Sequence, residues 1–104
     1  MSEPTTIYEI LSQGLSIPVT YGVFTTEQEL PFICILGDGQ DTFKAEDTFY
    51  ATKDRYTIEY YFKKKNPTQE ASIESLLLQH GWLYEKSEDA YIEDEGMFVV
   101  YYYI

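Results

Sequence analysis

The chain of 104 residues has few basic side chains, one histidine and one cysteine. Lys and Arg total 7 against 18 Asp and Glu, which gives a formal net charge of −11. Because phosphate binding requires a cationic surface, this balance argues against specific nucleic-acid binding. It argues equally against an anionic membrane surface. A single cysteine, Cys34, cannot form an internal disulfide.

Long apolar runs are also missing. No segment approaches the roughly 20 apolar residues that a bilayer-spanning helix needs. Residues 1–4 show no cationic stretch followed by an apolar run, so we expect no signal peptide and synthesis in the cytoplasm. The apolar fraction of 44% is ordinary for a globular protein. The length fits a single domain over residues 1–104.

Aromatic residues, in contrast, are plentiful: 17% of the chain, with 11 Tyr. Tyr combines a large ring with a polar group, which suits strand faces and wet interfaces. Residues 55–62 alternate with period 2, which predicts a strand with one buried face. The closing segment 97–104 is apolar or aromatic on both faces. This predicts either a central strand or a second face that packs against another subunit.

Two helices are indicated by their capping residues. Thr6 with Glu9 forms a capping box, which predicts a short helix over 7–13. Asn66 followed by proline predicts the start of a second helix, over 67–80. Its packing stripe consists of Ile73, Leu76 and Leu77. Gly81 is expected to end the helix.

Further strands are expected at 17–21, where Pro18 favours an edge, at 32–36, a continuous apolar run, and at 82–86, before the closing segment. Two Thr-Phe pairs between polar residues predict a projecting hairpin arm or loop at 37–54. The pattern as a whole predicts an α+β fold. We expect an antiparallel or mixed sheet with two helices packed on one face, plus an extended hairpin arm.

No residue pattern indicates catalysis, so we expect no enzyme, no cofactor and no metal site. His80 ends the second helix, where a cation is favoured electrostatically, and it has no partner group nearby in sequence. Cys34 in an apolar run is expected to act as a small core residue. The acidic stretch 38–41 lacks the register of a calcium loop. The acidic residues of 88–95 are more typical of a solvated face.

The run Lys63-Lys-Lys65 is the one cationic cluster in the sequence. Next to an aromatic strand it could form a surface for single-stranded nucleic acid. The net negative charge disfavours that interpretation. A solvated strand end, or a contact with an acidic neighbouring subunit, explains the run better.

The order of these elements resembles that of the small tail-completion, or head-to-tail joining, proteins of long-tailed bacteriophages, and of tail terminators of related fold. The resemblance is one of elements and hydrophobicity, without a signature site. The segments that carry it are the helix 7–13, the run LPFICIL over 30–36, the aromatic strand 55–62, the helix segment 73–77, and the closing strand 94–101.

The resemblance implies a non-enzymatic virion protein, assembled in the host cytoplasm. Such proteins form a ring, typically of six subunits, between the head connector and the tail tube. On this hypothesis we expect interface anchors at four aromatic residues, because aromatics often anchor interfaces. They are Phe43 and Phe49 on the arm, with Tyr101 and Tyr103 on the closing strand.

Two alternatives stay open. The tyrosines could instead cover the sheet edge of a monomer. An acidic protein of this size could also be a DNA mimic that inhibits a host nuclease or restriction enzyme. A mimic should place its carboxylates along one elongated face, spaced like phosphates, whereas here the acidic residues are spread along the sequence.

Overall fold

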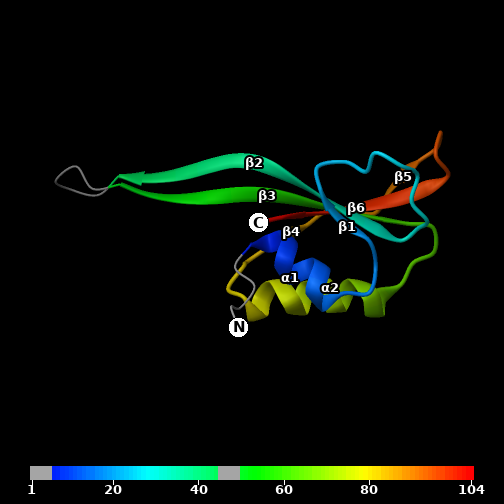
Figure 1. Cartoon of the computed structure of the whole chain (residues 1–104), viewed down its shortest axis with the longest axis horizontal. Helices are drawn as coiled ribbons and strands as arrows, with labels where there is room; N and C mark the ends of the chain where they lie inside the picture. The colour runs from blue at the N-terminus through cyan, green and yellow to red at the C-terminus, as the bar shows by residue number, and fades with distance from the viewer. Residues whose placement is uncertain (1–5, 45–49) are drawn as a thin grey trace.

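The computed structural model describes residues 6–44 and 50–104. Within them, a mixed sheet of six strands carries two helices on one of its faces (Figure 1). This is the α+β architecture that the sequence predicts. The strands are β1 (Val19–Tyr21), β2 (Phe32–Lys44), β3 (Tyr50–Phe62), β4 (Glu85–Lys86), β5 (Ala90–Ile92) and β6 (Met97–Tyr103).

Helix α1 spans Ile7–Gly14 and begins as its capping residues predict. The Thr6 hydroxyl oxygen accepts a hydrogen bond from the Glu9 backbone N–H at 3.1 Å. This satisfies one of the amides that have no partner within the helix. Ile7, Ile10 and Leu11 are buried.

Helix α2 spans Pro67–Gln79. The side chain of Asn66 accepts a hydrogen bond from the Gln69 backbone N–H at 3.1 Å. His80 forms the C-cap, and Gly81 follows with φ of 82°, a left-handed conformation that suits glycine. The helix therefore ends one residue earlier than predicted. Its packing stripe faces inward as predicted: Ile73 and Leu77 are buried, and Leu76 is partly buried against the core.

The strands follow the order β1-β2-β3-β6-β4, and β5 also pairs with β6. β1 is an edge strand and runs parallel to β2, while the other pairs are antiparallel. β6 therefore lies between β3 on one side and β4 and β5 on the other. The residue that follows β6 is also held, because Ile104 and Tyr56 exchange two backbone hydrogen bonds. The closing segment is thus a central strand.

The strands differ from the sequence predictions in several places, beginning with β1, which starts at Val19 instead of 17. β2 does not stop after 36 but continues past Gly37, with an irregular register before Gln40 and a positive φ at Gly39. Glycine permits such a bulge, so pairing resumes beyond it. β4 covers only two residues instead of 82–86, because only Glu85 and Lys86 pair with β6. β5 lies in a polar stretch where no strand was predicted.

Beyond the sheet body, β2 and β3 continue as a two-stranded arm that reaches away from the helices (Figure 1). In the arm, Gln40 to Lys44 pair with Asp54 to Tyr50. The predicted hairpin arm is confirmed over these described residues.

Candidate interaction surface

The alternation of side chains gives the sheet two different faces. Toward the helices lie buried side chains of β2, β3 and β6 that form the core: Ile33, Ile35, Ile58, Tyr60, Phe62, Val100 and Tyr102. The opposite face, which we call the open face, consists of three cross-strand rows. They are Phe32–Tyr61–Val99, Cys34–Glu59–Tyr101 and Leu36–Thr57–Tyr103.

The connection 22–31 covers one end of the open face. Figure 1 shows this segment on the side of the sheet away from the helices. Phe24 packs edge-on against Phe32, with ring centroids 5.4 Å apart. Between this connection and β6 lies a groove of about 520 Å³, to which Met97 and Ile92 contribute. Val99 at this end is buried.

The other end of the open face carries stacked tyrosine rings. Tyr101 and Tyr103 lie with centroids 6.1 Å apart and planes inclined by 18°, and Tyr103 is 37% exposed. Beside them, the Tyr61 hydroxyl donates a hydrogen bond to the Glu59 carboxylate at 2.9 Å. Burial, and next the charge of Glu59, raise the pKa of Tyr101. The Tyr101 phenol therefore stays a neutral donor at ordinary pH.

Of the four aromatic residues predicted as interface anchors, the structure brings together two. Tyr101 and Tyr103 share the open face of β6. Phe43 lies in the arm, in register with Ala51, and its side chain is not described. Phe49 lies outside the described residues. Tyr103 nevertheless lies at the base of the arm. It is in register with Thr57 of β3, and the arm pairing begins beyond Thr57 on the same strand, at Asp54.

Both edges of the arm lack a neighbouring strand among the described residues. β1 pairs with β2 only at residues 33–35, and β6 pairs with β3 only at residues 57–62. Two side-chain contacts link the arm strands: Arg55 with Asp41 at 2.9 Å, and Gln40 with Asp54 at 2.6 Å. A two-stranded ribbon in water is only marginally stable, and its free edges can pair with another chain.

A buried ionic cluster on the helix side was missed from the sequence. Glu70 is only 2% exposed, and its carboxylate lies 2.8 Å from the Lys86 Nζ and 2.9 Å from the Lys65 Nζ. The sequence did contain a signal. Glu70, Ile73 and Leu77 follow the i, i+3, i+7 spacing of one helix face, so the carboxylate belongs to the packing stripe.

Glu74 extends the same cluster. It lies 2.8 Å from the Lys86 Nζ and accepts a hydrogen bond of 2.8 Å from the Tyr102 hydroxyl. Burial alone would raise the pKa of Glu74, but the hydrogen bonds from Lys86 and Tyr102 hold it below its ordinary value. Burial likewise opposes the charge on Lys86, yet its bonds to both carboxylates raise the pKa of Lys86. The cluster joins α2 to β4 and β6.

The two residues considered for catalysis, His80 and Cys34, lie on different elements. His80 is exposed at the C-cap of α2. Cys34 is buried, and burial followed by the charge of Glu59 raises the pKa of its thiol, so it is not an activated nucleophile. Within residues 6–44 and 50–104, no three His, Cys, Asp or Glu side chains are grouped so as to hold a metal ion. In the same part of the chain, neither helix has the length and apolar character needed to span a membrane.

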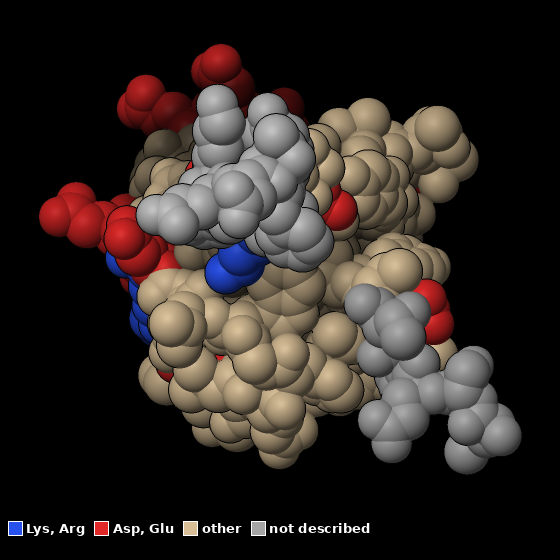
Figure 2. Space-filling model, turned by 90° about the vertical axis from the view of Figure 1, so that its left-hand side faces the viewer, with Lys and Arg blue, Asp and Glu red and all other residues tan. Residues whose placement is uncertain are grey.

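The acidic side chains form separate groups in the view from the arm end. Figure 2 shows them projecting at several places on the outline, with uncharged surface between them. The acidic side chains of the described residues that are visible in this view do not form the continuous stripe expected of a DNA mimic.

Comparison with known proteins adds no relative: no protein-family model matches the chain, and no curated protein matches it. Function is therefore inferred from the open face, the arm and the charge.

Proposed function

We propose that the protein is a non-enzymatic structural subunit that assembles with copies of itself into a ring. Following the resemblance of its elements to phage tail-completion and tail-terminator proteins, the ring belongs at the junction between head and tail. The observation that carries the proposal is the open, tyrosine-rich end of the sheet next to an arm whose two edges pair with no other strand among the described residues.

Assembly would cover surfaces that the single chain leaves open. Tyr101 and Tyr103 present large rings with polar ends, and such residues are typical anchors at protein interfaces. Tyr21 and Tyr91 are also more than half exposed. Each offers apolar area that a neighbouring subunit could remove from water.

The arm favours assembly for a different reason. Its backbone N–H and C=O groups along both edges face no described strand. A neighbouring subunit could satisfy them by adding a strand, which supplies main-chain hydrogen bonds. Repeating such a head-to-tail contact closes a ring when the rotation between subunits allows it.

The charge fits a passage for DNA. A ring between the head connector and the tail tube surrounds DNA that must move without being held. A subunit with a net charge of −11 repels phosphates and so avoids capturing them. The partners on either side would be the connector and the tail-tube proteins.

Sedimentation of the purified protein, alone and mixed with its connector and tail-tube partners, tests the proposal. We expect a discrete oligomer. Replacing the two stacked tyrosines together, Tyr101→Ser with Tyr103→Ser, should weaken assembly at least tenfold, because anchors commonly cost more than about 1.4 kcal/mol when truncated. The matched control is Tyr8→Ser, since Tyr8 is comparably exposed but lies on α1. It should leave assembly unchanged.

Two results would contradict the proposal. One is a protein that stays monomeric both alone and with these partners. The other is recovery of a host nuclease, without tail or connector proteins, when the tagged protein is used as bait. The second result would instead favour the DNA-mimic hypothesis.

A further inference from the structure

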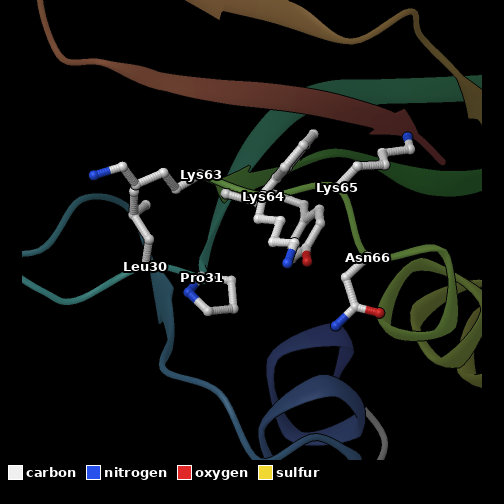
Figure 3. A pocket seen from close by; sticks show the side chains of 8 residues that line it. Leu30, Pro31, Lys63, Lys64, Lys65 and Asn66 are labelled. Carbon is white, nitrogen blue, oxygen red and sulfur yellow. The ribbon is translucent and has the colours of Figure 1, made fainter.

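The cationic run 63–65 borders a pocket at the junction of β3 and α2, on the side of the molecule away from the arm. The pocket has a volume of about 440 Å³. Its apolar wall consists of Leu30, Pro31 and Phe62, and Asn66 lies at its rim. Figure 3 shows Lys63 and Lys65 extending to opposite sides, with Lys64 between them.

Two of the three lysines in this run have no acidic partner among the described residues. Lys65 forms ion pairs with Glu70 and Asp89. Lys63 and Lys64 form no ion pair with any residue among 6–44 and 50–104. In a chain with 18 acidic and 7 basic residues, two successive lysines thus have no acidic partner in the part of the chain that the structure describes.

A second, independent observation points to a ligand. The hydroxyl of Tyr60, which also lines the pocket, is buried and has no hydrogen-bond partner among the described residues. A buried hydroxyl without a partner costs about 1–3 kcal/mol, so such groups are rare unless a ligand or water satisfies them. The Glu70 carboxylate lies near this hydroxyl and contacts Lys65 and Lys86. Its Oε2 is also buried and has no hydrogen-bond partner among the described residues, so a bound anion has to be held far enough from Glu70 for Lys64 to outweigh the repulsion.

We propose that this pocket binds a carboxylate group, held by the ammonium of Lys64 and accepting a hydrogen bond from the Tyr60 hydroxyl. Lys64 is exposed and its stem is flexible, so its movement admits the carboxylate oxygen to the hydroxyl. The apolar wall suits the methylene groups that carry a carboxylate in Asp or Glu. Hydrogen bonds that involve a charged group are about twice as strong as neutral ones.

Because the chain has a large excess of acidic residues, we expect the carboxylate to come from an acidic side chain of a second copy of this chain. The exposed turn between β5 and β6 carries Glu93, Asp94 and Glu95 in sequence. This choice of source rests on the proposed assembly, whereas the pocket itself does not. A free carboxylate or phosphate in solution offers the same chemistry from another source.

The test follows the backbone amide NMR signals of residues 62–66 at constant ionic strength. The probes are acetate, inorganic phosphate and a blocked peptide of residues 92–96, with the peptide carrying Gln and Asn in place of the acids as a control. We expect saturable shifts with the acidic peptide and none with its neutral counterpart. Lys64→Gln should weaken binding about tenfold or more, as for a lost charged hydrogen bond.

Two variants keep the site falsifiable. Tyr60→Phe retains the ring and removes the hydroxyl, so it should weaken binding and raise Tm in the absence of ligand. Lys53→Gln makes the same change in net charge at a distant exposed lysine, and it should leave the affinity within about twofold. Equal weakening by Lys53→Gln, or an unchanged affinity in Tyr60→Phe, would overturn the proposal.

The source of the carboxylate is decided by affinity and self-association together. Preference for the peptide over both small anions, with weaker self-association of Lys64→Gln, supports a second copy. Equal affinity for acetate, with unchanged self-association, supports a free anion at the same site. A monomeric protein that still binds acetate saturably would disprove assembly and leave the pocket standing.

Discussion

The two faces of the sheet differ in how their side chains are covered. On the helix side, the row Ile35–Ile58–Tyr102 is buried beneath α1 and α2. On the open face, the neighbouring row Leu36–Thr57–Tyr103 is only partly covered. The chain's own stability therefore comes mainly from one face. The other face keeps aromatic surface available for a partner.

The largest expected effect lies on the helix side. Leu77→Ala should lower the free energy of unfolding by about 2–5 kcal/mol, because Leu77 is fully buried and its loss leaves a cavity. Urea denaturation measures this. The adjacent Leu78, which is 53% exposed, provides the control, and Leu78→Ala should cost about 0.5 kcal/mol or less. Similar losses in both variants would mean that α2 does not pack as described.

The buried ionic cluster should give the next largest effect. Glu70→Gln removes a charge that contacts two lysines and should cost about 1–3 kcal/mol, less than for a fully buried pair because both lysines are partly exposed. Chemical denaturation at pH 7 measures the loss. Glu88→Gln removes an exposed carboxylate for which no ion pair is described, and it should be nearly neutral. An unchanged stability in Glu70→Gln would show that the cluster contributes nothing.

The lowered pKa of Glu74 predicts how the free energy of unfolding depends on pH. The pKa of Glu74 lies below its ordinary value in the folded protein. Its charged form therefore stabilises the fold above the unfolded pKa of about 4.3, and this contribution disappears as pH falls through the lower, folded value. The stability advantage of the native chain over Glu74→Gln should shrink between about pH 6 and pH 3. If the difference in unfolding free energy between the two proteins stays constant across that interval, the lowered pKa of Glu74 is contradicted.

The smallest effect on the isolated chain should come from the open face. Tyr103→Ser should change the stability of the monomer, measured at high dilution, by only about 0.5 kcal/mol, because the side chain remains partly in contact with water. At higher protein concentration the same variant should lose assembly. A loss of monomer stability comparable to that of Leu77→Ala would mean that the tyrosine belongs to the core. The contrast between the two faces would then disappear.

Several features were predicted from residues that are close in sequence. The caps at Thr6 and Asn66 depend on hydrogen bonds to backbone groups three residues away, and such bonds are visible in the sequence itself. The alternation in 55–62 likewise assigns each side chain to a face. These local patterns were enough to predict the α+β class, both helices and the hairpin arm.

Other features depend on residues that are far apart in sequence, and only the tertiary structure decided them. The continuation of β2 past Gly37 requires pairing with β3 beyond the bulge. Glu70 is buried because Lys86, on a different element, reaches its carboxylate.

The sequence by itself determined that the closing strand is apolar on both sides. Only the fold decided that the helices bury one side, while the connection 22–31 covers just part of the other. The physical reason is that local patterns follow from backbone geometry, whereas the burial of a sheet face depends on which surfaces, distant in sequence, pack together.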